Sequence, residues 1–226
     1  CMEYMKGCND NEFDLAITSP PYNMNLRTNK NLDGYMPRTE KKCITKKYKN
    51  SNDSLSMDQY LDFLDKVVSE LLRISKTTFF NIQMVTGNKP ALFKLLGKHA
   101  ENIKELIIWD KCHGQHAIGE RTLNSRYELI VVFNKDAITR QFEQAVFDRG
   151  TLDNLWQIQR VLSHDKTHGA TFPKLLVDRV LKNFSKRGDK VFDPFICNGT
   201  TAISAHYFGC DFVGCEIDES YYKTAC

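Results

Sequence analysis

The segment from residue 190 to residue 218 constrains the fold more than any other part of this sequence. It begins with an apolar run, Lys190–Phe195, and continues through a short turn, Ile196–Thr201, into a helical run, Ala202–Gly209. A second apolar run follows at Cys210–Asp218 and ends in acidic residues. Strand, tight turn, helix and strand in this order predict a β-α-β unit of an open α/β sheet.

Glu216 lies about as far past this turn as the acids that bind ribose hydroxyls in dinucleotide-binding folds. The unit therefore indicates a nucleoside cofactor held at the turn. A generic β-α-β unit with a helix-capping threonine would show the same pattern, so that alternative stays open for the segment taken alone.

The stretch Thr18–Asn23 reads Thr-Ser-Pro-Pro-Tyr-Asn and follows another apolar run, Phe13–Thr18. An apolar run of this length predicts a short strand. The Ser-Pro-Pro-Tyr loop would then lie at the carboxyl end of a strand, where open α/β sheets place their active sites. A Pro-Pro turn with a surface tyrosine is the alternative for this motif alone.

The residue types of the loop suit chemistry on an exocyclic amino group of a nucleic-acid base. Such an amine is conjugated with its ring and is a poor nucleophile, so an enzyme that alkylates it must draw its hydrogens toward acceptors. Ser19 Oγ and the Pro20 carbonyl can be those acceptors, and both prolines stiffen the loop because proline fixes φ. Tyr22 offers a flat face on which an extruded base can stack.

Helices and strands alternate between these two segments, as a doubly wound sheet requires. Ser56–Gln59 is a capping box, and an apolar stripe at helical spacing follows it. Strands are expected at 78–82, 106–109 and 127–133, with a helix from about 90 to 99. We expect one α/β domain over residues 1–226, with a Rossmann-like, mostly parallel sheet, helices on both faces and a small insertion.

Together these motifs resemble those of the S-adenosylmethionine-dependent DNA amino-methyltransferases, which methylate cytosine N4 or adenine N6. In the subgroup called β, the Ser/Asp/Asn-Pro-Pro-Tyr motif comes first and the cofactor turn, usually Asp-Pro-Phe-x-Gly-x-Gly-Thr-Thr, comes last, as here. A third stretch, His168–Leu176, resembles the H-x-A-x-F-P-x-x-L element that the family places against the methionine moiety. The three motifs cover nearly the whole chain in the family's order.

The resemblance implies a set of site residues. Ser19, Pro20, Pro21 and Tyr22 would form the catalytic loop for direct methyl transfer to a base flipped out of double-stranded DNA. S-adenosylmethionine would lie over the turn, with Glu216 on its ribose hydroxyls. The expected cofactor-binding residues are Asp193, Phe195, Cys197, Gly199, Thr200, Glu216, Phe172 and Pro173.

Two features depart from the family pattern. Cys197 stands where the cofactor turn usually has its first glycine. Because glycine permits positive φ and close approach of backbone to ligand, a side chain there is expected to weaken cofactor binding or to change the loop path. The family also has a strand ending in Gly-Asp just before the helix expected at residues 1–6. That strand is missing, so we expect either a trimmed N-terminus or a sheet with less material.

Basic residues concentrate just after the catalytic loop, although the net charge of +3 is too small to indicate a nucleic-acid partner by itself. We expect residues 24–56 to form a basic loop that closes over DNA phosphates, with a salt-sensitive affinity. A solvated loop without this role is the alternative. The expected DNA-binding residues are Arg27, Lys30, Arg38, Lys41, Lys42, Lys46 and Lys47.

Residues 134–167 break the alternation and occupy the slot of the subgroup's target-recognition segment. We expect them to read a short site or to share recognition with the basic loop, with a structural β-hairpin as the alternative. Trp109, near the end of an expected strand, either helps to shape the base pocket or is a buried core aromatic. Side chains with donors or flat faces suited to base edges are Arg140, Gln141, Arg149, Trp156, Gln157, Gln159 and Arg160.

The eight cysteines include no Cys-x-x-Cys pair, and no apolar run is long enough to span a membrane. We expect neither a disulfide framework nor a zinc ribbon, and Cys112–His116 fits no standard metal site. Reduced thiols and a cytoplasmic location, in a bacterial or a virus-infected cell, are expected.

The identity of the base stays open at this point. In the resembled family, serine in the first catalytic position and Phe-Pro in the upstream element go more often with cytosine N4, whereas Asp-Pro-Pro-Tyr goes with adenine. We favour a site-specific cytosine-N4 methyltransferase, with adenine N6 as the alternative. A DNA-binding member of the fold without turnover is an alternative of another class, and methylation of RNA or glutamine is a third. A homodimer and a restriction endonuclease partner are further expectations.

Overall fold

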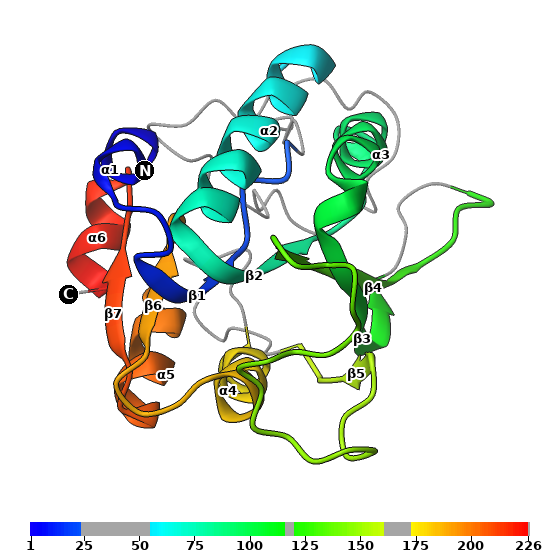
Figure 1. The fold of residues 1–226 in the computed structure, drawn as a ribbon. Coiled ribbons are helices and arrows are strands. Elements are labelled where there is room, and N and C mark those ends of the chain that lie inside the picture. Colours follow the sequence, from blue (N-terminus) through cyan, green and yellow to red (C-terminus); the bar gives the residue numbers. More distant parts are fainter. Residues whose placement is uncertain (24–54, 116–119, 161–172, 226) are drawn as a thin grey trace.

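One mixed sheet forms the centre of the molecule, and its seven strands lie in the order β5-β3-β4-β2-β1-β6-β7 (Figure 1). The computed structural model describes residues 1–23, 55–115, 120–160 and 173–225. The strands in them are β1 Phe13–Thr18, β2 Ser75–Ile82, β3 Ile103–Gln115, β4 Ser125–Asn134, β5 Leu155–Gln157, β6 Lys190–Asp193 and β7 Asp211–Gly214. The helices in them are α1 Met2–Gly7, α2 Met57–Ile74, α3 Lys89–Lys98, a 3-10 turn at Ala100–Asn102, α4 Lys174–Phe184, α5 Thr200–Phe208 and α6 Glu219–Ala225.

The pairing confirms a mostly parallel α/β sheet. β1 pairs in parallel with both β2 and β6, β6 with β7, and β3 with β5. β4 runs antiparallel to its two neighbours, β2 and β3. Because β3 and β4 follow each other along the chain, they form a hairpin, the connection that antiparallel pairing allows.

Helices cover both faces of the sheet, as expected. Figure 1 shows α1, α2 and α3 on one face and α4 and α5 on the other. Side chains alternate along β1, so Ala16 joins the core cluster under α2 and α3, whereas Leu15 and Ile17 join the cluster against α4. A strand covered on both faces must be apolar throughout, which explains the continuous apolar run at 13–18.

Helix α2 begins and packs as its sequence predicts. Ser56 Oγ accepts a hydrogen bond from Gln59 N, and Gln59 Oε1 accepts one from Ser56 N, which completes the capping box. The apolar stripe faces the sheet, and its buried members are Tyr60, Leu64, Val67, Val68 and Leu71.

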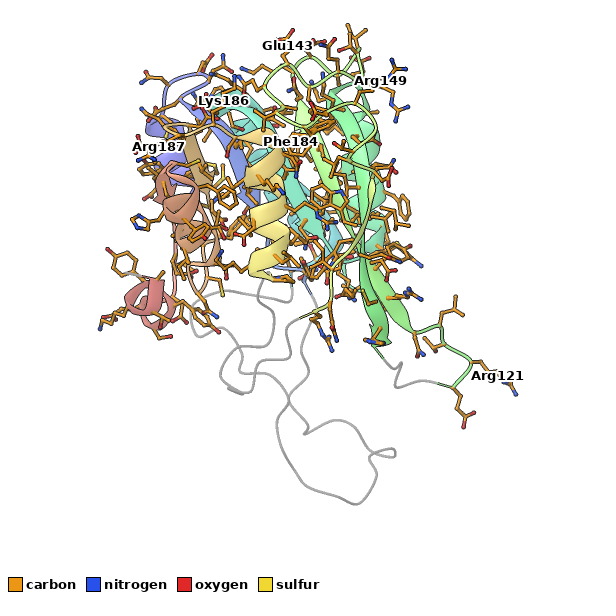
Figure 2. The ribbon with its side chains drawn as sticks, turned by 90° about the horizontal axis from the view of Figure 1, so that it is seen from below. Arg121, Glu143, Arg149, Phe184, Lys186 and Arg187 are labelled. Carbon is orange, nitrogen blue, oxygen red and sulfur yellow. The ribbon has the colours of Figure 1, made fainter. Side chains whose placement is uncertain are left out.

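The sheet has two ends with different roles. The parallel strands β1, β2, β6 and β7 end at one edge, here called the carboxyl edge, and begin at the opposite amino edge. β4 runs the other way, because Leu129 pairs with Ile82 and Asn134 with Thr77. The chain therefore leaves β4 at the amino edge. Figure 2 shows Glu143 and Arg149 at that end with Lys186 and Arg187, and Arg121 at the other.

Strand β3 differs from the sequence prediction. It was expected at 106–109, but it runs on to Gln115 because it pairs with β4 over most of its length, with a register shift after Asp110. Trp109 therefore lies inside a strand. Its side chain is buried in the core, and its Nε1 donates to Ile158 O at 2.8 Å. The core interpretation of Trp109 is the one that the structure supports.

Among the described residues, no helix is long and apolar enough to cross a membrane. No group of three or more His, Cys, Asp and Glu side chains in these same ranges is placed to hold a metal ion. The six cysteines in the described part of the chain are free thiols.

Candidate active site

The Ser-Pro-Pro-Tyr loop follows β1 at the carboxyl edge, and two helices hold its backbone. Tyr60 of α2 donates its hydroxyl hydrogen to Pro21 O at 2.6 Å. Asn88, which precedes α3, donates from Nδ2 to Tyr22 O at 2.9 Å and to Gln83 O at 3.0 Å. The loop is thus fixed from two sides, in addition to the stiffness of its prolines.

Asn23, the next residue, joins the two ends of the segment that follows the loop. Its backbone has φ 56°, a left-handed conformation that asparagine tolerates better than most residues. Its Oδ1 accepts from Leu55 N at 2.8 Å, and its Nδ2 donates to Leu55 O and Gly87 O at 3.0 Å. Residues 23 and 55 therefore lie next to each other beside the catalytic loop.

A buried polar network lies behind the loop and reaches Ser19. Ser19 Oγ and Tyr22 Oη are 2.8 Å apart, and Tyr22 Oη lies 2.9 Å from Glu128 Oε2. Asn81 Nδ2 donates to Tyr22 Oη at 2.8 Å and to Glu128 Oε2 at 2.7 Å. Lys111 Nζ lies 3.3 Å from Glu128 Oε1 in a buried ion pair. Three strands, β2, β3 and β4, thus contribute one side chain each.

The network keeps Tyr22 in its phenol form. Burial, together with the negative charge of Glu128, raises the pKa of Tyr22 well above its ordinary value. The hydroxyl therefore keeps the hydrogen that it can donate to Glu128 at neutral pH.

Asp193, at the end of β6, connects the catalytic strand with the expected cofactor turn. Thr18 Oγ1 donates to Asp193 Oδ1 at 2.8 Å, and Thr201 Oγ1 donates to Oδ2 at 2.7 Å. Phe195 N also donates to Oδ1, at 3.0 Å. Burial raises the pKa of Asp193 to about 6, against the effect of these hydrogen bonds.

This geometry gives Asp193 a structural role at the turn. The residue is only 1% exposed and its carboxylate already accepts three hydrogen bonds within the protein. It therefore holds the start of the turn from inside the protein, and its expected contact with the cofactor stays a prediction.

Cys197 and Glu216 meet on the outer side of the turn. Cys197 has φ 49°, the left-handed conformation that glycine adopts without strain, so the cysteine takes the backbone path of the residue it replaces. Its N–H donates to Glu216 Oε2 at 2.9 Å, while Ile217 N and Asp218 N donate to Glu216 Oε1. Burial and the nearby Glu216 raise the pKa of the Cys197 thiol to about 11.

The backbone conformation and the packing at position 199 both favour glycine. Its φ of +80° favours glycine, and a side chain there would lie 3.1 Å from the Cα of Ala225 in α6. The space that a side chain at position 199 would need is thus taken by α6, and the expected contact of Gly199 with the cofactor stays a prediction. Phe195, Cys197, Thr200 and Glu216 are all half-buried at the carboxyl edge.

The remaining predicted residues fall into three groups. The basic residues at 27–47 and Phe172 lie outside the described residues, and Pro173 is the buried residue just before α4. Arg140 lies near the amino edge, where it pairs with Glu105, and Arg149 lies at the same end in Figure 2. Trp156 is buried in β5, which corrects its expected role in base reading.

In the described part of the 134–167 segment, residues 157–160 lie at the carboxyl edge. Gln157 Nε2 lies 3.4 Å from Asp110 Oδ2, and Asp110 also receives two hydrogen bonds of 2.7 Å from Arg126. These hydrogen bonds from Arg126 lower the pKa of Asp110 to about 2. Gln157, Gln159 and Arg160 are exposed here.

Sequence reasoning missed Asn81, Lys111 and Glu128, the three strand residues of the polar network. Each is a polar residue within or at the end of an apolar run, and each is at least nine-tenths buried. A polar residue that interrupts an apolar run indicates a hydrogen-bonded site in the core, since polar groups buried in strands need partners. The sequence does not show which hydrogen-bond partners these residues have.

The arrangement brings an acceptor, Ser19 Oγ, and a fixed aromatic ring, Tyr22, to the same edge as a turn closed by the carboxylate of Glu216. Such a site can hold an amine against Ser19 and a ligand with hydroxyl groups against Glu216.

Known proteins resemble this chain in sequence and in fold. The model of the N6_N4_Mtase family, described as DNA methylase, matches residues 13–226. The type II methyltransferase M.BglII of Bacillus subtilis is 24% identical over 255 residues, which cover 96% of this chain and 63% of M.BglII. This chain thus spans less than two thirds of that relative. The DNA adenine methyltransferase YhdJ of Escherichia coli (strain K12) is 26% identical over 93% of this chain and 74% of its own length.

Two solved structures share the fold. The cytosine-N4-specific PvuII DNA methyltransferase has a TM-score of 0.72 and 15% identity, over 99% of this chain and 82% of that chain. TTHA0409 of Thermus thermophilus, complexed with S-adenosyl-L-methionine, has a TM-score of 0.64 and 20% identity, over 99% and 89%. The family model covers almost the whole sequence and includes both the loop after β1 and the turn after β6. The chain therefore belongs to the N6/N4 DNA methylase family.

Proposed function

We propose that this protein is an S-adenosylmethionine-dependent DNA methyltransferase that acts on the exocyclic amine of a base flipped out of double-stranded DNA. The observation that carries the proposal is the 2.8 Å hydrogen bond between Thr18 Oγ1 and Asp193 Oδ1. It places the loop of Ser19 and the turn of Cys197 side by side at one edge of the sheet. Membership of the DNA methylase family supports the same reaction.

The residues of the turn fit S-adenosylmethionine, which supplies a methyl group on a positively charged sulfur. Glu216 is half-buried, and three backbone N–H groups hold its carboxylate beside the turn. A carboxylate is an acceptor and suits the two donor hydroxyls of a ribose. The proposed cofactor contacts are Asp193, Phe195, Cys197, Gly199, Thr200 and Glu216, with Phe172 and Pro173 toward the methionine end.

Ser19 Oγ and the Pro20 carbonyl accept the amine hydrogens and orient the nitrogen. Bound S-adenosylmethionine would supply the methyl carbon to this nitrogen and keep the electron pair of the broken carbon–sulfur bond on sulfur, and the proton displaced from the nitrogen would pass to water. Tyr22 stacks on the base, and its buried hydroxyl holds the ring in place.

Cytosine N4 is the favoured base and adenine N6 the alternative. Serine in the first position of the loop favours cytosine, and the PvuII enzyme with the same fold is named as cytosine-N4-specific. YhdJ, a relative over most of the chain, is named as an adenine methyltransferase. Both bases present an amine beside a ring nitrogen, so the loop suits either.

DNA contacts are proposed at the carboxyl edge. Asn23 and Leu55 hold both ends of the basic segment beside the catalytic loop. We propose that the lysines and arginines of this segment contact the phosphates of DNA bound at the loop. Base reading is proposed for residues 157–167 and not for Arg140 or Arg149. Relatives named type II methyltransferases support a restriction endonuclease partner, and a homodimer and a cytoplasmic location belong to the same proposal.

The test is incubation of the purified protein with unmethylated DNA and S-adenosylmethionine, followed by digestion to nucleosides and mass spectrometry. N4-methylcytosine that is lost in Ser19→Ala and Tyr22→Ala is the expected result, and N6-methyladenine would change the base and keep the mechanism. Bound cofactor and DNA without any methylated base would instead support the silent DNA-binding member. Parallel reactions with RNA and protein distinguish those substrates.

A further inference from the structure

Glu128 is a buried carboxylate at the far end of a hydrogen-bonded chain that begins at Ser19. All three of its close polar contacts in the described residues are with groups that can donate: Tyr22 Oη at 2.9 Å, Asn81 Nδ2 at 2.7 Å and Lys111 Nζ at 3.3 Å. An ionised carboxylate accepts only, so this set of partners is the one it requires.

The chain has a definite direction because a phenol has a single hydrogen. Tyr22 donates that hydrogen to Glu128 Oε2, and Asn81 Nδ2 donates to the Tyr22 oxygen. Either Ser19 or Tyr22 could donate in the 2.8 Å contact between them. Since the hydrogen of Tyr22 is already used, Ser19 must donate its own, and its two lone pairs remain available.

We propose that Glu128 is a positioning residue that turns the Ser19 hydroxyl away from the substrate and leaves Ser19 Oγ as an acceptor for the amine. This inference rests on the function proposed above. The negative charge of Glu128 also polarises the chain toward Ser19, which favours the positive charge that develops on the amine nitrogen during transfer.

Glu128→Gln keeps the size of the side chain, removes the carboxylate that fixes this direction and leaves Lys111 without its counter-charge. Lys111 can only donate, so it retains the amide oxygen and the new amide nitrogen faces Tyr22 Oη. Tyr22 then accepts from the amide and donates its hydrogen to Ser19 Oγ or to a rotated Asn81 Oδ1, so Ser19 no longer has to donate to Tyr22 and its hydrogen is free to point at the amine. Asn81 can rotate to accept from the new amide, because its Oδ1 is buried without a partner among the described residues.

The experiment is a double-mutant cycle of Glu128→Gln and Tyr22→Phe, read by single-turnover methyl transfer to DNA and by calorimetric affinity for S-adenosylmethionine. Tyr22→Phe keeps the ring and removes the hydroxyl that transmits the effect. Glu105→Gln is the matched control, because Glu105 is a paired glutamate on β3 near the amino edge. Glu128→Gln is expected to slow transfer about 10- to 100-fold with the cofactor affinity unchanged within about twofold, and Glu105→Gln to change neither.

In the Tyr22→Phe background, Glu128→Gln is expected to have no further effect beyond about twofold. An equal slowing in both backgrounds, or no slowing in an active wild type, would overturn this proposal and leave the methyltransferase function standing. A wild type that transfers no methyl group to DNA would overturn both.

A second measurement does not depend on activity. In protein labelled at tyrosine Cζ, the Tyr22 resonance is identified by its loss in Tyr22→Phe. It should titrate at lower pH in Glu128→Gln than in the wild type, because the charge of Glu128 is one cause of the raised pKa of Tyr22. An unchanged titration would show that Glu128 does not act on the Tyr22 hydroxyl.

Discussion

Cys197 occupies a backbone conformation that normally calls for glycine, and a stability measurement can show what this costs. A non-glycine residue at φ 49° is strained by about 1 kcal/mol or more. Glycine at this position removes the strain, but part of the stability gained is lost because glycine has greater conformational freedom in the unfolded chain. We expect Cys197→Gly to raise the free energy of unfolding by about 0.5 kcal/mol. Cys197→Val, with a β-branched side chain, should lower it by about 1–2 kcal/mol.

Urea unfolding of the three proteins measures these changes, and calorimetry measures their affinity for S-adenosylmethionine. Cys197→Gly should bind the cofactor at least as tightly as the wild type, because the backbone path is already that of a glycine. A loss of stability in Cys197→Gly would show that the thiol packing outweighs the backbone strain.

Asp193 makes stability depend on pH in the direction opposite to most carboxylates. Its pKa is raised from 3.8 to about 6 by burial, so the folded state binds a proton that the unfolded state has released. The contribution of this residue to stability is therefore fully present below pH 3.8 and is lost as the pH rises through about 6. The loss corresponds to about 3 kcal/mol.

Asp193→Asn isolates this effect, since an amide cannot titrate. Between about pH 4 and pH 7, the unfolding free energy of the wild type should fall by about 2–3 kcal/mol relative to that of Asp193→Asn. Urea unfolding at several pH values measures it. A difference that stays constant over this range would contradict the raised pKa.

At the scale of elements, the start of α3 supports the catalytic loop through Asn88. This side chain is fully buried, donates to Tyr22 O and Gln83 O, and accepts from Val85 N. Asn88→Ala leaves these groups without their partner, so we expect a loss of about 2–3 kcal/mol in unfolding free energy. Methyl transfer should slow more than DNA binding weakens.

Thermal and urea unfolding, with single-turnover kinetics, check this expectation. Asn102→Ala is the control, because Asn102 lies in the 3-10 turn before β3 and is only half-buried. It should change stability by no more than about 0.5 kcal/mol. Equal kinetics of Asn88→Ala and wild type would mean that the loop holds its shape through its prolines and Tyr60 alone.

Elements with strong local signals could be predicted from the sequence. The capping box at Ser56 marked the start of α2, and the apolar run Phe13–Thr18 became β1. The first four residues of the apolar run Lys190–Phe195 became β6. The length of β3 could not be predicted, because residues 110–115 are in a strand only through pairing with β4. Local pattern cannot show a pairing that depends on a partner elsewhere in the chain.

The candidate site divides in the same way. The loop at Ser19 and the turn at Cys197 carry sequence motifs from which a function could be predicted. Glu128 and Asn81 belong to no sequence motif. Their contact with the catalytic loop follows only from the order of β1, β2 and β4 in the sheet. Asp193 carries a motif, yet its burial under the turn reflects the packing of Thr18 and Thr201, which no spacing reveals.

At the scale of the whole molecule, the two edges of the sheet assign different roles to residues that look alike in sequence. Arg140 and Arg149 lie at or near the amino edge. The two residues that flank the basic segment, Asn23 and Leu55, lie at the carboxyl edge. Because a base held at Ser19 must lie at the carboxyl edge, DNA phosphates should meet the basic segment and not these two arginines.

Salt dependence of DNA affinity separates the two sets of charges. Each phosphate contact contributes about 0.9 to the slope of log affinity against log salt concentration. Replacing Lys41, Lys42, Lys46 and Lys47 by alanine should reduce the slope by up to about 3.6 and weaken binding at low salt. Arg140→Ala with Arg149→Ala should leave both slope and affinity unchanged. Fluorescence anisotropy over a salt series measures this. A slope reduced only by the arginine pair would place DNA at the amino edge, away from Ser19, and so would contradict the proposed active site.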